Sequence, residues 1–366
     1  MYFDWHQITM REHKAMLGIV DYIVILVMLL MSGGIGVYFR FAGRKQKTAV
    51  EYLLAGKNMA IFPVTFSLMA SFLSSATILG MPAEMYRYGT QYALKIVGVA
   101  IGILLSSFLF LPVFFQIQVP TAYEYIQRRF GKLTRNVCSF FFVLQSILYL
   151  AVVLYGPGLA LSAVTNLSVW VSVISIGTVC TFYCTLGGMK AVLWTDVFQS
   201  VLMFFTMFAV IIKGCIDLGG VPEVVNIANE GGRLLWPGVE LDPKVRYTIF
   251  NLLLQGAISG LAGYGTSQVQ VQRLLTVKSL ARSRMALYLS IPLCCAFMFL
   301  NCFTGIVIYA YYAKCNPMTS PSKPISSADQ LLPYFIMSTL SNYPGLAGLC
   351  ICGIFSAALS TLVFRD

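Results

Sequence analysis

Charged residues are scarce in this sequence: they make up 11% of its 366 residues, whereas soluble domains carry about 25%. Hydrophobic residues make up 58%, and long apolar runs recur along nearly the whole chain. A soluble protein with one membrane anchor does not show this pattern, so lipid must surround most of the surface. Because backbone groups in lipid must form their hydrogen bonds internally, the spans are predicted to be helices.

Histidine is almost absent, with two residues and none beyond His13. A Cys/His zinc site is therefore not expected, and most of the ten cysteines fall inside apolar runs, where they serve as small packing residues. The predicted spans contain no His/carboxylate pair, metal-ligand cluster or nucleophile motif. We therefore expect a protein that is not an enzyme and that needs no cofactor.

The formal net charge of +11 could indicate a nucleic-acid-binding protein. No basic stripe with interleaved aromatic residues occurs on a soluble module, however, so no nucleic-acid partner is expected. The basic residues gather instead in alternate loops: fourteen of the 25 lysines and arginines fall in one set and eight in the other. The positive-inside rule then predicts that the richer set is cytoplasmic and that residues 1–16 are extracellular.

The apolar runs predict about nine transmembrane helices, which form a single transmembrane domain over residues 17–366. Their approximate bounds are 17–39, 61–82, 92–115, 137–162, 169–186, 192–216, 247–270, 284–312 and 345–363. An apolar stretch at 331–340 is too short to span, so we expect it to lie along the membrane surface or to pack over the helix bundle. Asn166 begins a glycosylation sequon in a very short outer loop.

The second predicted span, 61–82, is unusually polar for a helix in lipid. Its hydroxyl side chains are followed by two helix-weakening residues: Ser71, Ser74, Ser75 and Thr77, then Gly80 and Pro82. A break in this span, between about Ala70 and Pro82, would free backbone carbonyls, which are tolerated at membrane depth where they line a cavity or bind a hard cation such as Na⁺. The alternative is a kinked helix whose hydroxyls bond to its own turns.

Two glycines, Gly187 and Gly188, predict a tight turn between the fifth and sixth spans. Asp196 and Gln199 follow on one face of the next helix. A carboxylate just inside the bilayer is costly, so Asp196 indicates an ion path or a buried partner. Otherwise it caps the helix or pairs with Lys190 at the interface.

Glycine spacing predicts two further features. A G-x-x-x-G motif occurs at 98–102 and again at 256–260, and this spacing allows two helices to pack closely. Glycines at 263 and 265 precede a polar run, which predicts a second helix break in the seventh span.

The run from Thr185 to Gln199 reads T-L-G-G-M-K-A-V-L-W-T-D-V-F-Q, and it resembles the signature of the sodium:solute symporter family. Supporting stretches lie at 51–57, 79–89, 122–125 and 268–273. Within the family, the chain is most similar to the branch of the sodium-dependent multivitamin, monocarboxylate and iodide transporters. The resemblance covers residues 21–362.

The resemblance implies an all-α membrane protein: a partial bundle of the five-plus-five inverted-repeat kind found in amino-acid transporters. It implies a multi-pass symporter of the plasma membrane that couples Na⁺ to a small organic anion of vitamin or monocarboxylate type. Family members continue past the Ser360–Thr361 pair, so a chain that stops at Asp366 is expected to be truncated within its last helix. A non-transporting truncated isoform and a passive anion facilitator are the alternatives.

The resemblance also implies site residues. One sodium site would lie between the second and ninth spans, formed by carbonyls near Ala70, Leu73 and Ala357 and by the hydroxyls of Ser360 and Thr361. Asp196 would lie on the inner exit path of that ion. The substrate would lie beside the helix break, near Phe72, Ser75, Thr77 and Tyr264. Glu84 would repel an anion unless Arg87, three residues on, neutralises it.

Overall fold

The computed structural model describes residues 17–41, 49–117, 121–164, 168–320 and 324–362, and most of them are helical. Within these ranges no β-strand forms, apart from one isolated bridge between Gly238 and Thr248. The predicted all-α class is therefore confirmed. The predicted extracellular segment 1–16 and the Asn166 sequon lie outside the described residues.

All nine predicted spans coincide with helices. These are α2 (Ile19–Phe41), α4 (Ile61–Phe72) with α5 (Ser75–Tyr88), α6 (Lys95–Leu109) with α7 (Leu111–Ile117), α9 (Lys132–Val164), α10 (Val169–Leu218), which contains two of the spans, α12 (Ile249–Gly265), α14 (Leu280–Tyr311) and α16 (Leu346–Leu362). Among the described residues, five helices are long and apolar enough to cross a membrane, or six if the bent pair α4–α5 is one span. Helix α16 is apolar but shorter, with 17 residues.

Helix α10 contains two of the predicted spans, joined at Gly188. Gly188 has a φ of 59° and a ψ of −169°, which are not helical, and residues other than glycine rarely adopt such a positive φ. The predicted turn at Gly187–Gly188 is therefore present. Beyond it, Asp196 and Gln199 lie on one face of the helix, and both are fully buried.

The break in the second span lies at Leu73 and Ser74, where the backbone is extended and the two helix axes differ by 57°. The break therefore lies within the predicted range from Ala70 to Pro82, whereas Gly80 and Pro82 themselves lie inside α5. Ser74 starts the new helix: its carbonyl accepts the N–H of Thr77 at 2.9 Å. Pro82 removes only one backbone hydrogen bond, and α14 packs against this point.

The seventh span also breaks, slightly later than predicted. Helix α12 continues through Gly265, and α13 (Gln268–Leu274) follows after Thr266 and Ser267. The two G-x-x-x-G motifs face each other: a Cβ added at Gly102 would collide with the carbonyl oxygen of Ala257, and one at Gly256 with that of Lys95. The predicted close packing is confirmed, between α6 and α12.

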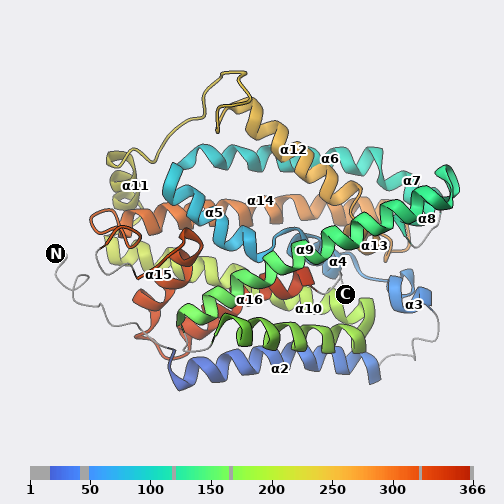
Figure 1. The fold of residues 1–366 in the computed structure, drawn as a ribbon, viewed down its shortest axis with the longest axis horizontal. Coiled ribbons are helices and arrows are strands. Elements are labelled where there is room, and N and C mark those ends of the chain that lie inside the picture. Colours follow the sequence, from blue (N-terminus) through green and yellow to red (C-terminus); the bar gives the residue numbers. More distant parts are fainter. Residues whose placement is uncertain (1–16, 42–48, 118–120, 165–167, 321–323, 363–366) are drawn as a thin grey trace.

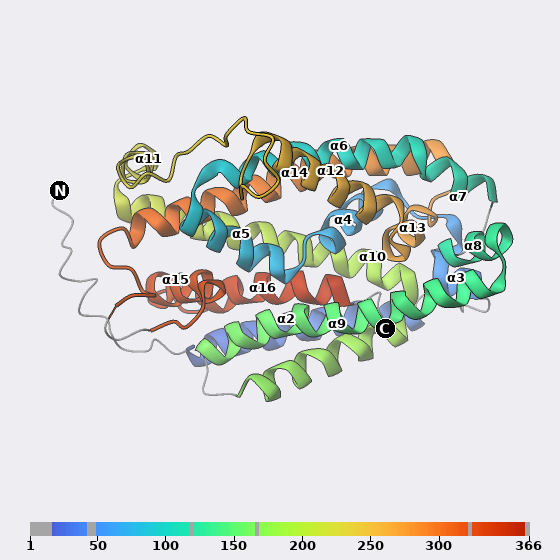
Figure 2. The ribbon, with the colours of Figure 1, turned by 45° about the horizontal axis from the view of Figure 1, so that its top comes forward.

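The short helices mark two opposite ends of the bundle, as Figures 1 and 2 show. At one end, here called the α8 end, lie α3 (Ala49–Leu54), α8 (Ala122–Phe130) and α13. At the other, the α11 end, lie α11 (Val221–Glu230) and α15 (Leu331–Leu340). Most of α15 is buried and it contacts α16, so the stretch at 331–340 packs over the bundle rather than along a surface.

Asp21 ties α2 to the start of α16. Its Oδ1 accepts hydrogen bonds from the backbone N–H groups of Gly345 and Gly348, at 3.1 and 2.8 Å, and its side chain is buried. A carboxylate at a helix start satisfies N–H groups that have no partner within the helix. This contact positions α16, which carries Ser360 and Thr361.

Replacing Asp21 with alanine should lower the free energy of unfolding by about 1–3 kcal/mol, because buried amides lose a charged acceptor. Denaturant titration of the detergent-purified protein measures the change. Asp21→Asn keeps an acceptor oxygen at the same position and should recover part of the loss. Equal unfolding midpoints for Asp21→Ala and the unmodified chain would contradict the role given to this carboxylate.

Candidate functional site

Oxygen atoms from α16 and from the end of α4 converge beside the helix break. The Ser360 hydroxyl donates hydrogen bonds to the carbonyl oxygens of Ala70, at 3.1 Å, and Ala357, at 3.2 Å. The Thr361 hydroxyl donates to the Ala357 carbonyl at 3.0 Å. Because α4 ends at Phe72, its last carbonyls lack the N–H groups that a continuing helix supplies.

Leu73, the fifth residue of the predicted sodium site, lies in the break itself and is buried. The set therefore offers backbone carbonyls and hydroxyls, the hard oxygen groups that alkali and alkaline-earth cations prefer. The hydrogen of a hydroxyl rotates about the C–O bond. Ser360 and Thr361 can therefore direct oxygen lone pairs toward a cation instead of donating to carbonyls. The chemistry of the donor set fits Na⁺.

Asp196 forms an ion pair that is completely buried. Its Oδ2 lies 3.0 Å from Arg273 Nη2, and neither side chain is exposed. Ser67 completes the cluster: its hydroxyl donates to the same Oδ2 at 2.5 Å and accepts from Arg273 Nε at 2.6 Å. The alternative prediction, that Asp196 pairs with Lys190 or caps the helix, was wrong. The partner comes from α13, 77 residues further along the chain.

This cluster lies about one helical turn from the candidate sodium site, because Ser67 precedes Ala70 by three residues on α4. Helix α13 places it on the side of the α8 end. Two buried charges are costly to desolvate, so the pair is stable only while both partners are present. Arg273 is one of the fourteen basic residues in the loops predicted to be cytoplasmic, and only its place after the polar run at 266–272 indicated burial.

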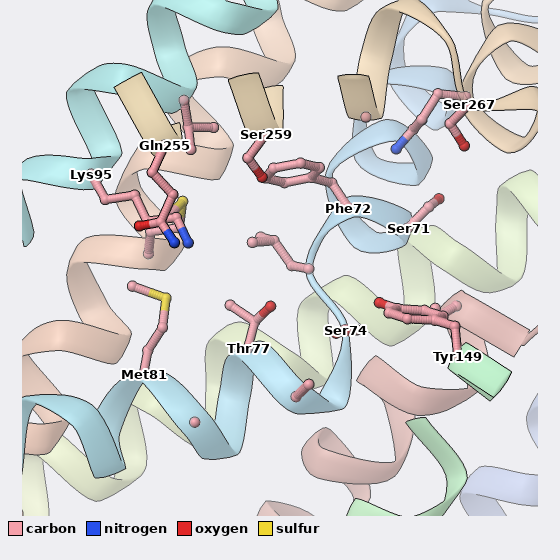
Figure 3. Close-up of a pocket in the computed structure, with 18 of the residues that line it drawn as sticks. Ser71, Phe72, Ser74, Thr77, Met81, Lys95, Tyr149, Gln255, Ser259 and Ser267 are labelled. Carbon is pink, nitrogen blue, oxygen red and sulfur yellow. The ribbon is translucent and has the colours of Figure 1, made fainter. Parts of the chain in front are cut away.

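A cavity of about 740 Å³ opens beside the break, and residues of α4, α5, α6, α9, α12, α13, α14 and α16 line it (Figure 3). Two of the predicted substrate residues, Phe72 and Thr77, line it, as do Leu73 and Thr361 from the candidate sodium site. Residues predicted for the ion and for the substrate therefore lie beside one helix break.

The other two predicted substrate residues are not part of this lining. The Ser75 hydroxyl donates to the carbonyl of Val153 on α9 at 2.8 Å, so it joins two helices. Tyr264 is buried behind Phe72, with the ring centroids 5.1 Å apart, and its hydroxyl donates to the Leu68 carbonyl at 3.2 Å. Tyr264 therefore supports the aromatic ring that faces the cavity.

Several polar lining residues were not predicted from the sequence. They are Lys95 on α6, Gln145 and Tyr149 on α9, and Gln255 and Ser259 on α12. Their only common signal was a polar side chain inside an apolar run. Periodicity alone does not show which of several such positions face a shared space.

Glu84 also lines the cavity, and its neutralising partner differs from the prediction. Arg246, in the segment before α12, lies 2.5 Å from Glu84 Oε1, and the Tyr247 hydroxyl donates to the same oxygen. Arg87 instead contacts the sulfur of Met318 at 3.7 Å. Spacing along one helix suggested Arg87, whereas packing between distant segments placed Arg246 there.

Comparison with known proteins extends these observations. The family model described as "Sodium:solute symporter family" matches residues 52–364. A protein of Drosophila melanogaster named "Putative sodium-dependent multivitamin transporter" is 45% identical over 348 residues, which are 95% of this chain and 57% of that protein. The human "Sodium-coupled monocarboxylate transporter 1" is 39% identical over 93% of this chain and 56% of its own length.

A solved structure of a Na⁺-coupled sialic acid symporter, in a substrate-bound outward-open state, superposes with a TM-score of 0.86. The two are 27% identical, and the match covers 95% of this chain and 72% of that one. This overlap confirms the predicted partial five-plus-five inverted-repeat bundle. The relatives are transporters, in agreement with the prediction that the chain is not an enzyme.

The chain spans about half the length of the curated relatives it matches. The family match nevertheless covers most of its residues, including the run from Thr185 to Gln199 and both helices of the candidate sodium site. The chain belongs to the sodium:solute symporter family.

Proposed function

We propose that this chain carries out sodium-coupled symport of a small organic anion, of vitamin or monocarboxylate type, across the plasma membrane. One observation supports this most directly: Leu73 and Thr361 belong to the candidate sodium site and also line the cavity that holds Phe72 and Thr77. An ion and a substrate that share one helix break influence each other's binding. That mutual effect is what coupled transport requires.

Sodium binding in this proposal orders the extended residues between α4 and α5, which completes the wall of the substrate cavity. By reciprocity, a bound substrate strengthens sodium binding by the same factor. The α11 end faces the outside and the α8 end faces the cytoplasm. Asp196, on the side of the α8 end, lies on the ion's exit path.

The available driving force is sufficient for accumulation. A tenfold sodium gradient supplies about 1.4 kcal/mol, and a potential of about 60 mV supplies about another 1.4 kcal/mol. One coupled ion therefore sustains roughly a hundredfold concentration ratio of substrate.

The choice of an organic anion is supported by the named relatives and by the lining of the cavity. Its volume lies within the range of small-molecule sites. Hydroxyl and amide groups line it together with Phe72, Tyr92 and Tyr149, and the carboxylate of Glu84 is already paired. Such a lining accepts a polar head and an apolar body.

Replacing external sodium with choline should abolish uptake of a radiolabelled monocarboxylate or vitamin by proteoliposomes that contain the full chain. Sodium-dependent accumulation against a gradient is the expected result, because the ion supplies the driving force. Uptake that persists unchanged in choline would indicate a passive facilitator. No uptake above that of protein-free liposomes would contradict transport by this chain.

A further inference from the structure

One lysine of the cavity lining, Lys95, has no carboxylate partner among the described residues. Of its lining residues, Glu84 and Lys95 are the charged ones. Glu84 is paired with Arg246, so this pair adds little net charge. Among the described residues, no Asp or Glu forms an ion pair with Lys95, so its ammonium is the charged group of the lining that lacks a partner of opposite sign.

Lys95 is held at the cavity wall by its surroundings. Its Nζ donates a hydrogen bond to the Tyr92 hydroxyl at 2.8 Å and lies 5.0 Å from the centroid of that ring. Its backbone is fixed where α6 packs against Gly256. An ammonium has three N–H donors, and Tyr92 uses one of them. The side chain is half-buried, so the remaining donors act in a partly desolvated space.

Packing of α6 does not explain a lysine at this position. Lys95 lies more than one turn inside the candidate membrane span Thr90–Ile117, where a charged side chain is costly. Charged residues within membrane spans usually face a cavity and serve a function there, and Lys95 faces this cavity.

Gln255 brings a second donor to the same place. Lys95, from α6, and Gln255, from α12, both line the cavity, and in Figure 3 both side chains extend toward it. The backbone of Lys95 packs against Gly256, the residue next to Gln255. Ser259 follows one turn along α12, and Phe72 lies beyond it. An ammonium and an amide together suit a carboxylate, and the aromatic ring suits an apolar body.

We propose that Lys95 selects anionic substrates: its ammonium receives the substrate's carboxylate, Gln255 donates a second hydrogen bond, and the organic body lies toward Phe72. This inference deepens the proposed function, and it relies on that function only for the anionic character of the substrate. Charge-assisted hydrogen bonds are about twice as strong as neutral ones, so the carboxylate is preferred over a neutral isostere.

Equilibrium binding to the purified full chain in nanodiscs tests this at saturating sodium chloride. The probes are butyrate against butyramide, and biotin against biotinamide, which differ in the carboxylate alone. We expect the unmodified chain to prefer each carboxylate by about 10- to 100-fold. K95M should abolish the preference, whereas K95R should keep much of it because it keeps the charge.

K244M is the matched control, because Lys244 is an exposed lysine outside the cavity. It should behave like the unmodified chain. A K95M protein that keeps the preference, or an unmodified chain that shows none in either pair, overturns the proposal. If K95M fails to fold, butyrate but not butyramide should protect Lys95 of the unmodified chain from amine acylation, and equal labelling with both overturns it.

Sodium dependence separates this inference from the proposed function. A carboxylate preference that depends on Lys95 but not on sodium supports the role of Lys95 and contradicts symport. Sodium-driven uptake with the preference unchanged in K95M supports symport and contradicts the role of Lys95.

Discussion

Replacing Arg273 with methionine should lower the free energy of unfolding by about 3–5 kcal/mol, because Asp196 would remain buried and unpaired between α4, α10 and α13. Neither partner is exposed at the surface of the folded bundle, so solvent does not screen the carboxylate. Its second oxygen, Oδ1, already makes no hydrogen bond to the described residues. Arg273 is therefore the main source of compensation for the charge.

Denaturant unfolding of the purified protein measures this effect. Arg128→Met is the matched control: Arg128 pairs with Glu124 at 2.6 Å on the surface of α8, where such a pair contributes about 0–1 kcal/mol. The double variant Asp196→Leu/Arg273→Met replaces both charges by apolar groups and should regain much of the lost stability. An Arg273→Met protein as stable as Arg128→Met would show that the buried pair is unimportant for the fold.

The same double variant separates stability from transport. If Asp196 lies on the exit path of the ion, as proposed, the doubly substituted protein should fold and yet show little sodium-driven uptake. Uptake at the unmodified rate would remove Asp196 from the ion path while leaving its structural role intact.

Replacing Ser360 and Thr361 together with alanine should raise the sodium concentration needed for half-maximal uptake by at least about tenfold. Each substitution removes a hydroxyl oxygen from the candidate site, and an interaction with a charged group contributes about 1.5–3 kcal/mol. Such a loss corresponds to a factor of about 10 to 100 in affinity. The substrate concentration for half-maximal uptake should rise as well, because coupling is reciprocal.

Ser356 supplies the matched control on the same helix. It lies one turn before Ser360, it is buried, and its hydroxyl has no hydrogen-bond partner among the described residues. Ser356→Ala should therefore leave the sodium dependence unchanged. A Ser360→Ala/Thr361→Ala protein with the sodium dependence of Ser356→Ala would refute the assignment of this site.

Much of the fold followed from composition and spacing. Each predicted span coincides with a helix because burial in lipid requires long apolar runs with internal hydrogen bonds. The packing of α6 on α12 followed from glycines four residues apart, since their missing Cβ atoms allow two backbones to approach. The turn at Gly188 followed from the conformational freedom of glycine.

The sequence predicted a helix break between Ala70 and Pro82, but local rules alone did not fix its position within that range. Gly80 and Pro82 weaken a helix in isolation, but contacts with α14 keep α5 continuous there. The actual break at Leu73 and Ser74 exposes the end of α4 to α16. Helix propensity is a weak prior when tertiary packing opposes it.

The sequence by itself determined that this protein is a bundle of membrane helices and, through the run from Thr185 to Gln199, which family it belongs to. Only the tertiary structure decided the partners of its charges: Arg273 for Asp196, Arg246 for Glu84, and none among the described carboxylates for Lys95. Spacing along one helix relates residues three or four apart, whereas these pairs join segments 77 and 162 residues apart. Such contacts depend on how whole helices pack, which a pattern along one stretch of sequence does not encode.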